Sequence, residues 1–265
     1  KAGFLPDDIL FTPNNAPFSE VEEAVRLGIH VNIDSLSALR KFGQKFGDTY
    51  ALFVRLNPHI LAGGNPKIQT GHIDSKFGIS IFQLPEVEEI VAEYKIKVEG
   101  LHVHTGSEFL DAGVFLQGAS ILYRAAASFP DIRYIDFGSG FKVAYKDGDV
   151  VTPLEELGKQ LQQSVAEFEQ KAGRKVQIWF EPGKFIVSDC GKLLCTVTTV
   201  KRTPTSMFLG VDSGLNHLIR PMMYDAYHTI ENISRDGGNH QIYNVVGYIC
   251  ETDTLGYERS LPETK

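Results

Sequence analysis

Two histidines lie where they could act on a ligand. His102 and His104 stand two residues apart in an apolar run, and on a β-strand such residues project to the same face. They could be structural histidines satisfied by hydrogen bonds, ligands of a metal ion, or, for one of them, a flat ring that stacks on a planar cofactor. A metal would need further ligands from other strand ends, and the remaining histidines are not placed to supply them. Metal binding therefore ranks below the other two interpretations.

A loop of small residues follows a second apolar run. The segment reads Asp136-Phe137-Gly138-Ser139-Gly140, and small side chains let backbone N–H groups approach an anion such as phosphate. A simple tight turn explains the same residues equally well. The dinucleotide-binding fingerprint is excluded, because Val143 stands where its third glycine would be.

Charged residues follow a third apolar run, which ends just before Glu181. Glu181 comes directly after apolar residues, and Pro182 and Gly183 then fix a turn. The carboxylate could form an ion pair with a ring nitrogen, and Lys184 could pair with a phosphate or a carboxylate. The alternative is a capped turn whose charges are solvated.

Two further pairs of residues lie near the C-terminal end of the sequence. Arg220 and Tyr224 are four apart near the expected start of a helix and could bind a carboxylate together, although a structural ion pair is the ordinary alternative. Cys250 follows an apolar strand and precedes Glu251. A partly exposed cysteine beside charges can act as an acid or a nucleophile, whereas most lone cysteines at strand ends only fill space.

Alternating strand and helix patterns must position these residues. Apolar runs rich in β-branched and aromatic residues predict strands over residues 9–13, 30–34, 51–57, 98–105, 133–137 and 176–181. Helical patterns separate them, including one over 111–128 and one that a capping box at Thr152 starts and that runs to about 173. Such alternation predicts a parallel sheet. Polar residues follow nearly every strand, which favours an α/β fold of the TIM-type (β/α)8 barrel over an open sheet.

The barrel is expected to be incomplete, and a second domain is expected to follow it. A (β/α)8 barrel has eight strands, so we expect its first two strand–helix units to be absent from the N-terminus of this chain. After residue 191, strands are predicted over 192–201, 206–212 and 241–249, with one short helix around 222–233. The predicted domains are a barrel domain over residues 1–190 and a partial, β-rich C-terminal domain over residues 191–265.

Composition limits the kinds of partner. The 265 residues carry a formal net charge of −7 and no run of basic residues, so no nucleic acid is expected. No apolar stretch approaches the ~20 residues that cross a bilayer, so no membrane partner is expected. The chain has three cysteines, an odd number, and none of them has C-x-x-C spacing. This argues against a disulfide framework or a zinc site, and it favours a reducing cytoplasm.

Taken together, the motifs resemble those of the fold-type-III decarboxylases that use pyridoxal phosphate. Each motif alone is weak, but their order over nearly the whole chain is highly specific. The matching segments are Arg55-Leu56-Asn57-Pro58, Thr70-Gly71, Ser75-Lys76-Phe77-Gly78, residues 100–107, Gly138-Ser139-Gly140, Glu181-Pro182-Gly183, Arg220-Pro221-x-x-Tyr224 and Ile249-Cys250-Glu251.

The resemblance implies pyridoxal 5'-phosphate as the cofactor and assigns residues to it. His104 would stack on the pyridine ring. Glu181 would bond the ring nitrogen and keep it protonated, so that the ring can accept electrons from the substrate. The residues implied at the cofactor and its phosphate are Ser107, Gly138, Ser139, Gly140 and Gly183.

The resemblance also implies how a small amino-acid substrate is bound. Arg220, Tyr224 and Lys184 would bind a substrate carboxylate, and Glu251 would hold the distal ammonium of a diamino acid. Cys250 would return a proton to the α-carbon after carbon dioxide leaves. In the family, the cysteine and the glutamate reach the active site of a partner subunit, so a homodimer with shared active sites is implied.

The sequence departs from the family pattern in three places. Lys184 replaces an arginine, which removes bidentate binding of a carboxylate or phosphate. Ser139 interrupts a glycine triplet, although serine is small enough to fit. The lysine that holds the cofactor, carried on the first barrel strand in the family, has no counterpart here. A tyrosine-bearing segment that the family pattern places after the Cys250-Glu251 motif is also absent. We therefore expect pieces to be missing at both ends, and we expect this chain alone to be inactive and less stable than the whole.

The implied reaction is decarboxylation of meso-2,6-diaminopimelate to L-lysine and carbon dioxide. Arg220 and Glu251 together favour a substrate with charges of both signs at its far end. Same-fold alternatives act on ornithine, lysine, arginine or carboxynorspermidine. Alternatives of other classes are a metal-dependent barrel hydrolase built on His102 and His104, and a catalytically silent protein that binds the cofactor.

Overall fold

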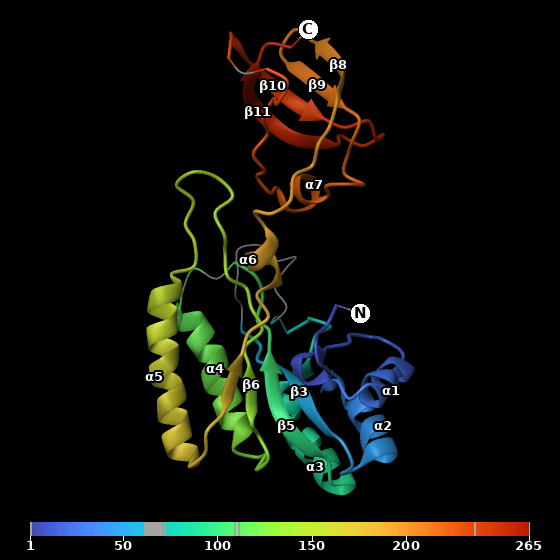
Figure 1. Ribbon diagram of the computed structural model, residues 1–265, viewed down its shortest axis with the longest axis vertical. Helices are drawn as coiled ribbons and strands as arrows, with labels where there is room; N and C mark the ends of the chain where they lie inside the picture. Colours follow the sequence, from blue (N-terminus) through green and yellow to red (C-terminus); the bar gives the residue numbers. More distant parts are fainter. Residues whose placement is uncertain are drawn as a thin grey trace. The chain divides into compact units, whose positions relative to one another are not determined.

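The computed structural model describes residues 2–60, 71, 73–108, 110, 112–235 and 237–264, so Thr70 of the quoted motifs lies outside the described part. The chain forms two compact units, one of residues 1–143 with 151–186 and one of residues 144–150 with 187–265. Figure 1 draws the strands of the first unit in blue to gold and those of the second in orange and red. The domain limits at residues 190 and 191 remain a prediction, and the compact units change over between 186 and 187.

The first unit is built on a parallel β-sheet. Its strands, in their order across the sheet, are β1 (Leu10–Phe11), β2 (His30–Ile33), β3 (Ala51–Asn57), β5 (Lys97–Val103), β6 (Tyr134–Asp136) and β7 (Gln177–Trp179). The short β4 (Ile79–Ser80), which the sequence did not predict, pairs with β3. All these pairings are parallel. The six predicted strands are confirmed, and together with the helices they form an incomplete TIM-type barrel.

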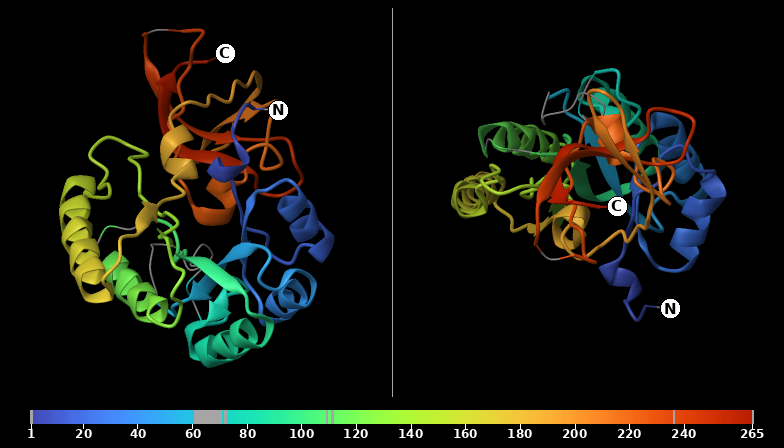
Figure 2. Two further views of the ribbon diagram at one scale, coloured as in Figure 1. Left: turned by 60° about the horizontal axis from the view of Figure 1, so that its bottom comes forward. Right: turned by 90° about the horizontal axis from the view of Figure 1, so that it is seen from above.

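Helices follow the strands in turn. They are α1 (Phe18–Arg26), α2 (Leu36–Phe46), α3 (Leu84–Tyr94), α4 (Ala112–Ala126) and α5 (Leu154–Ala172), with 3-10 turns η1 (Pro6–Asp8) and η3 (Ile81–Gln83). Figure 2 shows α1 to α5 as an arc outside the parallel strands. Each helix buries one apolar stripe against the sheet, as Leu39 and Phe42 of α2 do with no exposed surface.

The predicted capping box at Thr152 is wrong, although the helix that it announced is present. Helix α5 begins at Leu154, with Pro153 as its N-cap and no side-chain hydrogen bond to cap it. The hydroxyl of Thr152 instead accepts the backbone N–H of Lys142 at 2.7 Å. Thr152 is buried, and this longer-range hydrogen bond satisfies its oxygen in place of the helix end.

The second unit is a four-stranded mixed sheet with its own core. Its order is β11 (Thr254–Pro262), β10 (His240–Val246), β9 (Met207–Val211) and β8 (Val197–Arg202). The β8–β9 and β10–β11 pairs are antiparallel, whereas β9 and β10 run parallel. Tyr243 is fully buried in this core. The three predicted strands are present, although β8 begins at Val197 and not at 192, and β11 is an addition that the sequence did not predict.

Two short helices complete the description. Helix α6 (Gly183–Val187) begins in the first unit, and α7 (Arg220–Tyr224) lies in the second. The helix predicted around 222–233 is therefore wrong in extent, because Asp225 takes a left-handed conformation with φ of 53° and ends the helix. Within the described residues, no helix has the length and apolar character that a membrane span requires.

Candidate active site

The register of the parallel strands builds a buried polar layer in the first unit. Arg55 of β3 pairs with His102 of β5, and His102 pairs with Asp136 of β6. Paired residues on neighbouring strands share a face of the sheet, and all three are buried. The layer below is aromatic. In it, Phe53 of β3 and Tyr134 of β6 both pair with Gly100 of β5. Charged and imidazole groups thus gather toward the carboxyl ends of the strands.

His102 connects this layer to Glu181. Its Nδ1 lies 2.9 Å from the amide nitrogen of Asn32, and its Nε2 lies 3.3 Å from Oε2 of Glu181. An amide nitrogen can only donate, so in this arrangement Nδ1 accepts and Nε2 carries the proton. That buried N–H faces the carboxylate without the alignment of a hydrogen bond. The sequence had placed His102 among structural or metal-binding histidines, and contact with Glu181 is a role it did not suggest.

Two carboxyl groups beside His102 have opposite pKa shifts. Burial raises the pKa of Glu181, but its interactions with the neighbouring imidazoles and with Arg55 outweigh burial and lower the pKa overall. Burial raises the pKa of Asp136 to about 6, against the opposing effect of His102. Glu181 is therefore an anion at neutral pH, and Asp136 loses its proton only as neutrality is approached.

His104 is a neutral ring held against the small-residue loop. Burial lowers its pKa to about 4, and the neighbouring His102 and Arg55 act in the same direction. The backbone N–H of Ser139 donates to Nδ1 of His104 at 3.1 Å. Gly138 has φ of +61°, and a Cβ there would lie 2.7 Å from the same Nδ1, so a glycine is required. An uncharged, flat imidazole held in this way can face a planar ligand.

The remaining residues predicted for the first unit lie on the adjoining segments. Gly140 ends the small-residue loop, and Ser107 is a half-buried residue on the loop after β5. Gly183 begins α6, and its N–H donates to the carbonyl of Glu181 at 2.8 Å. The ammonium of Lys184 lies 3.3 Å from a carboxylate oxygen of Glu108, which the sequence did not single out. Direct contact among the predicted residues is thus clearest for His104 with the Gly138–Ser139 turn.

A metal ion is a weaker interpretation of the same cluster. Ligand atoms of His102, Asp136 and Glu181 lie within 4.8 Å of one another, whereas His104, which the metal hypothesis needed, is not one of this group. One oxygen of Asp136 already accepts the N–H of Gly138 at 2.8 Å. The described geometry therefore favours a carboxylate–imidazole pair over a set of ligands around an ion.

The second unit holds the other four predicted residues. Arg220 donates to the hydroxyl of Tyr145 at 3.2 Å and lies over the same ring, a partner that the sequence did not suggest. Tyr224 is the last residue of α7 and is half-buried. Cys250 and Glu251 are exposed on the loop between β10 and β11, with the Cys250 sulfur 3.4 Å from Oε2 of Glu251. The structure thus pairs the cysteine with the carboxylate beside it.

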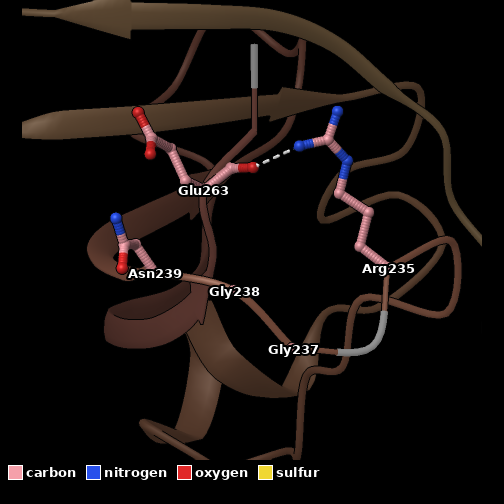
Figure 3. A pocket seen from close by; sticks show the side chains of 5 residues that line it. All are labelled: Arg235, Gly237, Gly238, Asn239 and Glu263. Carbon is pink, nitrogen blue, oxygen red and sulfur yellow. Dashed lines mark hydrogen bonds between the residues drawn. The ribbon is translucent and has the colours of Figure 1, made fainter.

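A small hollow in the second unit holds none of the predicted residues. Its lining is Arg235, Gly237, Gly238, Asn239 and Glu263, as Figure 3 shows. Arg235 donates to the backbone carbonyl of Glu263 at 2.7 Å. Since all five lining residues are exposed, the hollow is a surface feature without the buried polar groups that mark the first unit.

Comparison with known proteins places this architecture in one class. Residues 1–188 match the family model described as "Pyridoxal-dependent decarboxylase, pyridoxal binding domain". An incomplete parallel barrel with a glycine-containing loop beside a neutral histidine is consistent with that class. The chain belongs to the pyridoxal-dependent decarboxylase family.

The relatives with curated names point within that family. The chain is 34% identical to a diaminopimelate decarboxylase of Archaeoglobus fulgidus over all of this chain and 65% of the relative. It is 33% identical to the enzyme of that name from Methanothermobacter thermautotrophicus, over 99% of this chain and 63% of the relative. A crystal structure of a diaminopimelate decarboxylase matches the whole chain with a TM-score of 0.89, 30% identity and 66% of its own length covered. The chain thus spans a little under two thirds of the relatives that it matches.

Proposed function

We propose that the protein decarboxylates meso-2,6-diaminopimelate to L-lysine and carbon dioxide with pyridoxal 5'-phosphate. The observation that carries the proposal is the contact between neutral His104 and the Gly138–Ser139 turn, beside anionic Glu181, in a chain of this family. The named relatives support the substrate. A structure from Helicobacter pylori that is described as complexed with L-lysine, at 28% identity and a TM-score of 0.86, is consistent with the product.

The described residues of the first unit fit the cofactor. The uncharged ring of His104 suits stacking on a pyridine, and Glu181, as an anion, suits a protonated ring nitrogen. The phosphate is assigned to the backbone of Gly138, Ser139 and Gly140, with Ser107 and Gly183 on adjoining segments. When bound, pyridoxal phosphate draws electrons away from the α-carbon of the substrate, which lets carbon dioxide leave.

His102 helps to keep Glu181 ionised. Its Nδ1 accepts from Asn32, so its Nε2–H faces the carboxylate and favours the ionised form. Asn32 is itself fully buried, which fixes the imidazole on the floor of the site. The protein therefore holds a negative charge where the ring nitrogen is to be protonated.

The residues assigned to the substrate are those that the resemblance implies. Arg220, Tyr224 and Lys184 bind carboxylate groups. Glu251 binds the distal ammonium, and Cys250 returns a proton to the α-carbon after carbon dioxide has left. The Cys250 thiol lies 3.4 Å from the Glu251 carboxylate, so the two side chains lie together on the loop.

The proposal also includes an oligomeric state and a cellular location. We assign a homodimer in which Cys250 and Glu251 serve the partner's active site, in line with their exposure. A reducing cytoplasm suits the three cysteines, which are free and exposed in the structure.

The test is a comparison of substrates with the complete gene product and added pyridoxal phosphate. Turnover of meso-diaminopimelate should exceed that of ornithine, lysine, arginine and carboxynorspermidine by at least about 100-fold, because a site built to bind the polar groups of one substrate discriminates strongly against substrates that leave those groups unpaired. Preference for one of the other four would keep the family and replace the substrate. Cofactor binding without turnover of any of them would support the catalytically silent alternative.

A further inference from the structure

A buried carboxylate joins the two loops of the second unit that lead to the proposed substrate-binding residues. Asp253 is only 1% exposed and ends the loop between β10 and β11. Its Oδ2 accepts the backbone N–H of Ile249 at 3.0 Å, and its Oδ1 accepts that of Leu215 at 2.6 Å. Ile249 directly precedes Cys250, and Leu215 lies on the loop that leads into α7 and Arg220.

Asp253 also joins the two ends of the loop that carries Cys250. The N–H of Gly247 donates to the backbone carbonyl of Asp253 at 2.8 Å. Cys250 and Glu251 occupy the exposed tip of this loop. The carboxylate of Asp253 folds back inside the loop, so the position of the tip depends on the hydrogen bond to Ile249.

Two glycines show how tightly the loops close around this carboxylate. A Cβ on Gly214 would overlap Oδ2 of Asp253, and a Cβ on Gly247 would overlap the same oxygen. The Gly247 Cβ would also lie 2.5 Å from the backbone oxygen of Ser213 on the other loop. With no room for a side chain on either loop, the carboxylate has little freedom to move.

We infer that Asp253 is a positioning residue for the proposed reaction. It sets the backbone next to Cys250 and ties that loop to the one before Arg220. The inference rests on the proposed function, in which Cys250 supplies the proton. A displacement of about 1 Å at a reacting group can lower a rate about 100-fold, so the loss of this link should be seen in turnover.

The test begins with Asp253→Asn in the complete gene product. Asparagine keeps the size of aspartate but replaces one acceptor oxygen by an NH2 donor, so one of the two backbone N–H groups loses its acceptor. We expect kcat with meso-diaminopimelate to fall about 10- to 100-fold, while the affinity for pyridoxal phosphate stays unchanged. Asp212→Asn is the matched control, because the exposed Asp212 also accepts a backbone N–H, that of Thr196 at 2.7 Å, and should leave kcat unchanged.

A double-mutant cycle separates positioning from general support of the fold. If Asp253 acts through Cys250, Asp253→Asn should cost less than about 2-fold in a Cys250→Ala background. Equal losses in both backgrounds would overturn the inference, as would an unchanged kcat in Asp253→Asn when Cys250→Ala lowers kcat strongly. If Cys250→Ala itself leaves kcat unchanged, the proposed role of the cysteine fails first and the inference fails with it.

Amide hydrogen exchange supplies a readout that needs no turnover. Asp253→Asn should speed exchange at residues 213–218 and 247–252 together, while the buried strand around Tyr243 keeps its protection. Faster exchange throughout the second unit would mean that the substitution only destabilises the fold, and it would overturn the inference. Unchanged exchange in both loops would overturn it as well.

Discussion

The two units solve the problem of holding reactive groups in different ways. In the first unit, strand register stacks Arg55, His102 and Asp136 on one buried face, and burial shifts the pKa of His104 to about 4 and that of Asp136 to about 6. In the second unit, Cys250 and Glu251 are exposed on a loop. Regular structure sets both position and charge in the first unit, whereas loop hydrogen bonds set position alone in the second.

Of all the substitutions, loss of the exposed Cys250 thiol should lower turnover most. Cys250→Ala should lower kcat by about 100- to 10,000-fold, the usual range for loss of a proton donor, while pyridoxal phosphate binds as before because the first unit holds it. Steady-state kinetics and cofactor titration measure the two quantities. Cys195→Ala, which alters another exposed free cysteine, is the control and should change neither. An equal loss of cofactor affinity in Cys250→Ala would break the division of labour between the units.

A smaller loss is expected when the negative charge of Glu181 is removed. Glu181→Gln keeps the shape but removes the anion that favours a protonated ring nitrogen, and should lower kcat by about 100-fold. The absorbance of the bound cofactor should also change its pH dependence. Glu156→Gln is the control, because Glu156 is an exposed carboxylate of α5 that contacts Gln160 and lies outside the His102–Glu181 pair. A normal kcat in Glu181→Gln would refute the electron-withdrawing role of this site.

The shifted pKa values of the first unit predict opposing effects of pH on stability. His104 has a pKa of about 4, below its ordinary 6.5, so its contribution to stability is present above pH 6.5 and is lost as the pH falls toward 4. Asp136 has a pKa of about 6, above its ordinary 3.8, so its contribution is present below pH 3.8 and is lost as the pH rises through 6. Between these limits the two contributions offset one another.

A substitution that removes one of these two groups should reveal the effect of the other on the pH dependence of stability. In Asp136→Asn, the free energy of unfolding should fall more steeply than in the unaltered protein on acidification from pH 6.5 to 4, by about 2 kcal/mol over the interval. In His104→Gln the fall should be shallower. Urea unfolding at several pH values measures both slopes. Identical slopes in all three proteins would contradict the idea that burial sets these pKa values.

A change in stability alone, independent of pH, is expected in the aromatic layer below the site. A Cβ at Gly100 would overlap the ring of Phe53, so Gly100→Ala should lower the free energy of unfolding by about 1–3 kcal/mol. Gly158 in α5 has open space around its Cβ position and is the matched control. Gly158→Ala should raise stability by about 0.5–1 kcal/mol. A neutral Gly100→Ala would show that the layer is looser than its packing indicates.

The sequence predicted the strands of both sheets except β4 and β11, because most of the others carry an apolar run. It predicted that His102 and His104 lie on one strand and share a face, but β5 ends at Val103, so His102 lies on the strand and His104 follows it. It did not predict the contact of His102 with Asn32, which lies 70 residues away, or the raised pKa of Asp136. Both depend on which strands become neighbours and on what they bury, and neither is written in local spacing.

The errors lie where local signals compete with tertiary contacts. The helix expected around 222–233 stops at Tyr224, because Asp225 takes a left-handed conformation. Strand β11 was not predicted, and Glu258 within it has a positive φ of 51° that interrupts the extended backbone. Asp253 gave no signal either, since nothing in its neighbours shows that its carboxylate is buried between two loops.

The most direct test of the account is the balance of products from meso-diaminopimelate. The complete gene product, supplied with pyridoxal phosphate, should release carbon dioxide and L-lysine in equal amounts, and Cys250→Ala should slow both equally. Loss of substrate without L-lysine, or no release of carbon dioxide despite bound cofactor, would contradict the proposed decarboxylation.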